Sequence, residues 1–199
     1  MSRVEMHAPF TNFSGTIGKL VYRKYRGRTI VAMKPDADRP LSQAEVAHRQ
    51  DFAQAATWAK AALQDEELRL FYEALGKQRD IPAPRPALRS RGGRAAAVSD
   101  FLKRPTLEAL DLSEYTGQAG DPIYFMAGDN AGLVDATVTI GDGNGTIFES
   151  GAAVEVDADT GYWMYTAQSA LPEVSLAAIN VRVSDRPGNI VEVSEEKDF

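Results

Sequence analysis

The fold of the C-terminal half is decided by residues 134–149, which read VDATVTIGDGNGTIFE. Apolar and polar residues alternate on both sides of Gly141–Gly145, as they do in strands with one buried face. Glycine adopts the positive φ that tight hairpin turns need. We therefore predict a β-hairpin here. A phosphate-binding loop is disfavoured because the Lys-Ser/Thr pair of such loops is missing.

Similar short runs, separated by turn residues, continue on both sides of this hairpin. Their spacing is typical of an antiparallel β-sandwich of about 90 residues. We expect Trp163 to lie in its core. The predicted strands are Ile123–Ala127, Val134–Ile140, Thr146–Glu149, Ala153–Val156, Tyr162–Thr166, Leu176–Val183 and Ile190–Val193.

The N-terminal half has a different pattern. Lys19–Tyr25 and Arg28–Lys34 read as two paired strands around Gly27. Ser42 and Glu45 form a capping box, which predicts a helix whose apolar face carries Phe52, Ala56, Ala59 and Leu63. Asp65 is expected to cap a second helix that ends near Gly76 and forms an antiparallel helical hairpin with the first.

Residues 79–94 are expected to be a linker or arm, because three prolines and Gly92-Gly93 disfavour a helix. A short helix, Ala95–Leu102, then closes the first unit. We therefore predict two domains: residues 1–104, an α+β unit of a β-hairpin and a helical hairpin, and residues 105–199, an all-β sandwich. The arm contains Arg79, Arg85, Arg89, Arg91 and Arg94.

Charge divides the chain at the same place. Residues 1–104 hold 19 of the 22 Lys and Arg against 11 carboxylates, a net charge of +8. Residues 105–199 hold 3 basic residues against 17 carboxylates, a net charge of −14. Two units with opposite fields attract different partners, and each can attract another copy of the same chain.

Few residues of this chain suggest catalysis. It has no cysteine and two histidines, His7 and His48, neither in a metal-binding or triad motif. The acidic turns around Asp129, Asp142, Asp157 and Asp159 lack the spacing of a calcium loop and read better as solvated turns, although calcium between them stays open. We expect no enzyme activity and no cofactor. The first 30 residues lack the apolar core of a signal peptide, so cytoplasmic synthesis is expected.

The C-terminal half resembles a bacterial immunoglobulin-like domain. The resemblance rests on a strand at Val134–Ile140, on Glu149-x-Gly151-x-Ala153, on the aromatic run Tyr162–Tyr165, and on a final strand leading to Asp185-x-x-Gly-Asn189. It implies an immunoglobulin-like sandwich. Because such domains mostly present surfaces or extend assemblies, it also implies an interaction role by analogy.

The N-terminal half resembles an uncharacterised group of bacterial and prophage-encoded proteins. The matching features are Gly15-x-Ile17-Gly18, the turn at Gly27, the strand ending in Pro35, Ser42-x-x-Glu45 and Phe71-Tyr72. This resemblance implies the company of phage-like structural proteins.

Two functional hypotheses follow. The first is a structural subunit that self-assembles head to tail into a filament, tube or phage-like particle, its basic N-terminal unit docking on the acidic sandwich of the next copy. The second is a nucleic-acid-associated protein, because Tyr22 and Tyr25 stand among basic residues. In both, the expected interaction residues are Arg23, Lys24, Arg26, Arg28, Arg79, Arg85, Arg89, Arg91 and Arg94. No membrane partner is expected.

Overall fold

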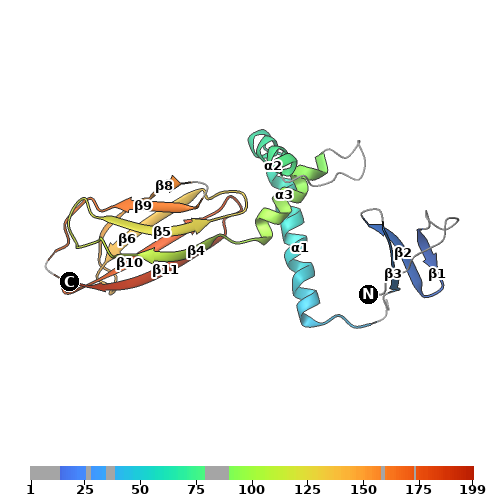
Figure 1. Ribbon diagram of the computed structural model, residues 1–199, viewed down its shortest axis with the longest axis horizontal. Coiled ribbons are helices and arrows are strands. Elements are labelled where there is room, and N and C mark those ends of the chain that lie inside the picture. Colours follow the sequence, from blue (N-terminus) through green and yellow to red (C-terminus); the bar gives the residue numbers. More distant parts are fainter. Residues whose placement is uncertain (1–13, 26–27, 35–38, 79–89, 158–159, 173) are drawn as a thin grey trace. The chain divides into compact units, whose positions relative to one another are not determined.

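The computed structural model of the protein describes residues 14–25, 28–34, 39–78, 90–157, 160–172 and 174–199 (Figure 1). The chain divides into two compact units, Met1–Val46 and Ala47–Phe199. This division differs from the predicted domain boundary at residue 104, because the helices after Val46 contact the sandwich.

The first unit contains a three-stranded antiparallel sheet, here called the N-terminal sheet. Its strands are β1 (Gly15–Ile17), β2 (Leu20–Tyr25) and β3 (Arg28–Met33), in that order. The pairing of β2 with β3, from Leu20↔Met33 to Tyr25↔Arg28, confirms the predicted hairpin. Strand β1 was not predicted, because three residues are too few to show an alternating pattern.

Three helices follow: α1 (Gln43–Ala62), α2 (Glu66–Gln78) and α3 (Ser90–Leu102). The predicted capping box is present at the start of α1. The Ser42 N–H donates to Glu45 Oε2 at 2.9 Å, and the Glu45 N–H donates to Ser42 Oγ at 3.3 Å. Asp65 caps α2 as predicted, since its Oδ1 accepts from the Leu68 N–H at 3.0 Å.

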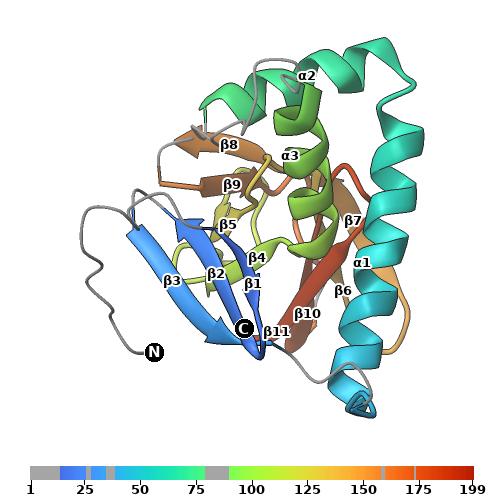
Figure 2. The same cartoon turned by 90° about the vertical axis from the view of Figure 1, so that its right-hand side faces the viewer.

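The predicted antiparallel hairpin of α1 and α2 is wrong. Figure 2 shows α2 turned across the direction of α1, and the extensive helix contact is between α2 and α3. Glycines allow this contact. A Cβ added to Gly76 would meet the carbonyl carbon of Gly92 at 2.5 Å, and one added to Gly93 would meet Glu73 at 3.1 Å. The helix backbones therefore approach more closely than side chains would permit.

The same contact explains why α3 is longer than predicted. Gly92 and Gly93 were interpreted as helix breakers inside an arm, yet both lie in α3. Their intrinsic cost of about 1 kcal/mol each is offset by packing on α2. Residues 79–89, the remainder of the predicted arm, lie outside the described residues.

Two four-stranded antiparallel sheets form the sandwich. One has the order β11-β10-β6-β7 and the other β4-β5-β9-β8. Strand β4 was not predicted, because a bulge at Ala109, where φ is 49°, interrupts its alternation. The strand bounds are β4 Thr106–Asp111, β5 Pro122–Gly128, β6 Asp135–Gly141, β7 Ile147–Ala152, β8 Val154–Asp157, β9 Tyr162–Thr166, β10 Leu176–Ser184 and β11 Ile190–Asp198.

The core of the sandwich lies between these sheets. Alternate residues of the central strands are buried, including Ile123 and Phe125 of β5 and Val138 and Ile140 of β6. Trp163 is half-buried and stacks on Phe125 with ring centroids 6.3 Å apart, while its Nε1–H donates to the Ala127 carbonyl. It therefore packs against the core at one edge rather than filling its centre.

Contacts from the turn between β10 and β11 join the helices to the sandwich. The Asn189 side-chain amide donates to the Phe101 carbonyl of α3 at 3.3 Å. The Arg186 guanidinium lies 3.9 Å from the centroid of the Phe71 ring of α2. These contacts cross the predicted boundary at residue 104, which is why helices and sandwich form one compact unit.

Candidate interaction surfaces

The predicted interaction residues are divided by the structure. Arg23 and Lys24 lie exposed on β2, and Arg28 begins β3. Arg91 and Arg94 lie in the first turns of α3, where Arg94 is exposed. The remaining predicted residues, Arg26, Arg79, Arg85 and Arg89, lie outside the described residues. The described members therefore form two groups, one on the N-terminal sheet and one on α3.

The N-terminal sheet has no core of its own among its described side chains, none of which is fully buried. The register places Ile17 opposite Leu20 and Leu20 opposite Met33, so the three residues share one face. Ile17 is 55% exposed and Met33 is 67% exposed. Three-stranded sheets need a packed hydrophobic face to be stable, so this face is suited to contact with another surface.

The sequence of these strands is strongly basic. Residues 14–34 contain six Lys and Arg and no carboxylate, the six being Lys19, Arg23, Lys24, Arg26, Arg28 and Lys34. Adjacent like charges repel one another unless a negative partner approaches. The N-terminal sheet thus combines an exposed apolar face with a sequence that holds six cations and no carboxylate.

The sandwich presents opposite chemistry along β8. Among the described strands, β8 is the last of its sheet and pairs only with β9 (Figure 1). All four of its residues are exposed: Val154 is 65% exposed, Val156 is 55% exposed, and the other two are Glu155 and Asp157. This strand is therefore a short, apolar and acidic sheet edge.

Aromatic residues lie on β5 and β9 of the same sheet. The rings of Tyr124 and Tyr162 are stacked with centroids 5.3 Å apart. Met126, which is opposite Tyr162 in the register, is exposed beside them. Burial, followed by the negative charges of neighbouring groups, raises the pKa of Tyr162 above its ordinary value.

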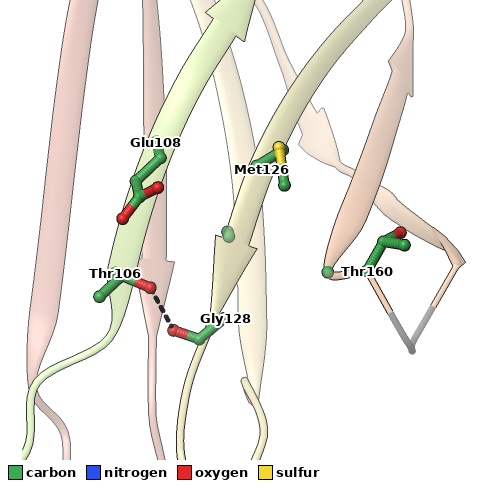
Figure 3. A pocket seen from close by; sticks show the side chains of 7 residues that line it. Thr106, Glu108, Met126, Gly128 and Thr160 are labelled. Atoms are coloured by element: carbon green, nitrogen blue, oxygen red, sulfur yellow. Dashed lines mark hydrogen bonds between the residues drawn. The ribbon is translucent and has the colours of Figure 1, made fainter.

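A cleft of about 340 Å³ opens where β4 and β5 pair (Figure 3). The Thr106 hydroxyl donates to the Gly128 carbonyl at 3.2 Å, and Glu108 and Met126 lie above this pair. Among the described residues that line the cleft, Glu108 is the one that ionises.

A larger groove of about 770 Å³ runs between α1 and α3. Phe52, predicted to be part of the buried face of α1, is instead 51% exposed and lines this groove. The buried residues of α1 are Ala55 and Ala59. Alanines at these positions let neighbouring helices approach closely. Arg94 and Lys103 line the groove together with its apolar residues.

A buried carboxyl group lies where the helices meet the sandwich. Asp100 of α3 is fully buried, and its Oδ2 accepts a hydrogen bond from the Tyr72 hydroxyl at 2.5 Å. Burial raises the pKa of Asp100 to about 6; the Tyr72 hydrogen bond opposes the shift, and the nearby Asp129 and Asp185 add to it. Sequence reasoning missed this group because Asp100, which follows the apolar run Ala95–Val98 and Ser99, belongs to no motif.

Neighbouring side chains complete this junction. Asp185 is also buried and accepts from the Asn189 backbone N–H at 2.6 Å and from its side-chain amide at 2.7 Å. The Arg186 guanidinium donates to the Ala131 carbonyl at 2.9 Å. These bonds order loops of the sandwich, and the Asn189 side-chain amide also links its loop to the Phe101 carbonyl of α3.

The acidic turns have structural roles as well. In the β6–β7 turn, Asp142 Oδ1 accepts from the backbone N–H groups of Asn144 and Thr146, which confirms the predicted hairpin turn. Within the described ranges, no three His, Cys, Asp or Glu side chains gather closely enough to hold a metal ion. The helices of those ranges are too short or too polar to cross a membrane.

Comparisons with known proteins identify no family. No family model and no curated protein matches the chain. Among solved structures, CopC from Methylosinus trichosporium OB3b has a TM-score of 0.34 at 21% identity, covering 47% of this chain and 90% of its own. An engineered protein also has a TM-score of 0.34, at 16% identity, covering 59% of this chain and 28% of its own. Similarity at this level carries no functional argument.

Proposed function

We propose that this protein is a non-enzymatic structural subunit that assembles head to tail, the N-terminal sheet of one copy docking on the sandwich of the next. The products are filaments, tubes or phage-like particles. The sandwich would be of the immunoglobulin-like type, as its strand and turn pattern suggests. A contact between two different surfaces of identical subunits repeats indefinitely unless its rotation closes a ring.

One observation carries the proposal. The N-terminal sheet exposes Ile17, Leu20 and Met33 within a sequence of six cations and no carboxylate, while residues 105–199 have a net charge of −14. Surfaces of opposite charge associate faster because the electrostatic attraction steers them together. Once docked, they can bury apolar area. None of the described side chains of this sheet is fully buried. Contact with another surface would therefore bury apolar area that the single chain leaves exposed.

The test is self-association across a salt series, measured by sedimentation velocity and negative-stain microscopy. Assembly is expected at low salt, with weakening as the Debye length falls below about 10 Å. The double variant Arg23→Glu with Lys24→Glu should abolish it. The matched control is Lys60→Glu with Lys77→Glu, which changes the net charge equally on exposed positions of α1 and α2. A monomer at high concentration and low salt contradicts the proposal.

A second function is favoured by one feature, the placement of Tyr22 next to Arg23 and Lys24 on β2. Aromatic and basic side chains together bind nucleic-acid backbones and bases. Titration of labelled duplex and single-stranded DNA at about 50 mM salt tests it. Binding that Arg23→Glu with Lys24→Glu removes, in the absence of self-association, would replace the assembly proposal.

A further inference from the structure

The two edges of the sandwich are not equivalent. On one side, β4 and β11 contact each other across the two sheets, so these edge strands cover one another. On the other side, β7 continues through a single residue, Ala153, into β8. Of these two strands, β8 is the one whose four residues are all exposed.

An edge strand with exposed valines is a site for strand addition. Native sheets normally protect their edges with charge, with proline or with covering segments. In β8, Val154 and Val156 are both more than half exposed, and the only charges are the negative ones of Glu155 and Asp157. A strand that adds here must therefore be apolar and basic.

Strand β3 has that chemistry. It is an outer strand of the N-terminal sheet, with β2 as its only pairing neighbour among the described strands. Its sequence is RTIVAM and the next residue is Lys34, so cations flank a run of β-branched and apolar residues at both ends. The six residues of β3 are enough to pair with all four residues of β8.

We propose that β3 of one copy pairs with β8 of the next, so that the N-terminal sheet extends the β4-β5-β9-β8 sheet of a neighbouring sandwich. This inference rests on the proposed function and identifies the strands through which neighbouring copies would make contact. Backbone hydrogen bonds along the two edges supply affinity, while Val154 and Val156 against the apolar side chains of β3 supply specificity. The cations beside β3 offset the carboxylates of β8.

Disulfide trapping between copies tests the pairing directly, because the native chain has no cysteine. One preparation carries Val154→Cys, and three others carry Thr29→Cys, Val31→Cys or Met33→Cys. Alternate positions along β3 sample different registers on one face. Mixing two single-cysteine proteins means that any heterodisulfide joins different copies, so pairing within one chain cannot contribute.

At least one of the three mixtures should give a heterodisulfide about tenfold faster than the control mixture, since docked edges bring Cβ atoms within about 5.5 Å. The control pairs Val154→Cys with Leu70→Cys, an exposed position on α2. Rates equal to the control in all three mixtures, in a protein that still assembles, overturn the pairing and leave the proposed function standing.

A proline variant supplies an independent readout. The β8–β9 register runs from Glu155↔Trp163 to Asp157↔Tyr162 and skips Val156. Val156→Pro should therefore leave β9 pairing intact while blocking strand addition, because proline lacks the N–H and is tolerated at edges and bulges. Assembly should be lost while the melting temperature of the sandwich stays within a few degrees.

If Val156→Pro unfolds the sandwich, Glu155→Lys is used as the test variant instead. Residue 155 is exposed, so this substitution changes the charge of the edge without altering its backbone. If either Val156→Pro or Glu155→Lys folds and still assembles, the proposed pairing is overturned. Complete absence of assembly in the unaltered protein instead overturns the proposed function, and the pairing with it. The two failures are thus distinguished by whether the unaltered chain assembles.

Discussion

The N-terminal sheet and the sandwich are both antiparallel β-structures, yet only the sandwich buries its apolar residues. In β5 and β6, inward residues such as Phe125 and Val138 are fully buried between two sheets. In the N-terminal sheet, apolar residues at similar spacing, such as Leu20 and Met33, stay exposed. Alternation therefore predicts a strand but not what covers it. What covers a strand depends on packing between elements that are distant in the sequence, which alternation does not record.

Phe125→Ala should produce the largest effect and confirm that the sandwich is stabilised by its own core. Removing a fully buried aromatic side chain costs about 3–5 kcal/mol, because contacts are lost and a cavity remains. Urea denaturation of the variant measures this. Met126→Ala, the exposed neighbour on the same strand, is the control and should cost less than about 1 kcal/mol. Equal losses would place the core elsewhere.

A pair of glycine variants tests the helices next. Gly76→Ala should destabilise the protein by about 1–3 kcal/mol, because the added Cβ would lie 2.5 Å from the backbone of Gly92 and force α2 away from α3. Gly92→Ala should be neutral or slightly stabilising, since its Cβ would lie 3.8 Å from Gly76 and alanine favours helix. Thermal melting of both variants checks the difference, and similar shifts would contradict the geometry.

The buried Asp100 gives a pH-dependent test of the same unit. Its pKa, about 6, lies above that of an exposed aspartate, so the folded state binds the proton more tightly than the unfolded state. This group therefore stabilises the fold most below about pH 4, and its contribution is lost as the pH rises through about 6. The groups around it are Tyr72, Asp129, Asp185 and Arg186.

Asp100→Asn should remove that dependence while keeping an acceptor for the Tyr72 hydroxyl. The stability of the variant relative to the unaltered protein should rise between pH 4.5 and 7.5 by on the order of 1–3 kcal/mol. Comparison of the two proteins at each pH is needed because carboxylates with lowered pKa, such as Glu149, act in the opposite direction. A constant difference across this range would show that Asp100 is ionised throughout.

The smallest effect is expected in the N-terminal sheet. Leu20→Ala should change the melting temperature of the dilute monomer by no more than about 1 °C, because the side chain is exposed in the single chain. Under assembling conditions, the same variant should weaken association. A large loss of stability in the monomer would mean that another part of the same chain covers this face.

The sequence predicted strands better than the contacts between elements. Strand β9 was predicted at its observed bounds, Tyr162–Thr166, since its aromatic run alternates and ends at clear turns. Strand β4 was missed because its bulge breaks the alternation. The α2–α3 contact was missed because Gly92 and Gly93 pack against α2, which is distant in the sequence. Local helix propensity carries no information about such packing.

The candidate surfaces show the same limit. Arg23 and Lys24 were predicted from local composition; both are exposed on β2, and their role in binding stays a prediction. The exposed edge at β8 was not anticipated, because the sequence does not reveal which strand ends a sheet. Likewise, Asp100 and Tyr72 are 28 residues apart, so their hydrogen bond appears only once α2 and α3 are packed.

The turn between β10 and β11 also has a mechanical consequence. A force on the sandwich reaches the helices by two parallel routes: the covalent connection at residues 103–105, and the contacts of Asn189 with Phe101 and of Arg186 with Phe71. Bending at the covalent connection must stretch those side-chain contacts. Under small loads the helices and sandwich should therefore turn as one stiff body, and a hinge should open only when the contacts of this turn break.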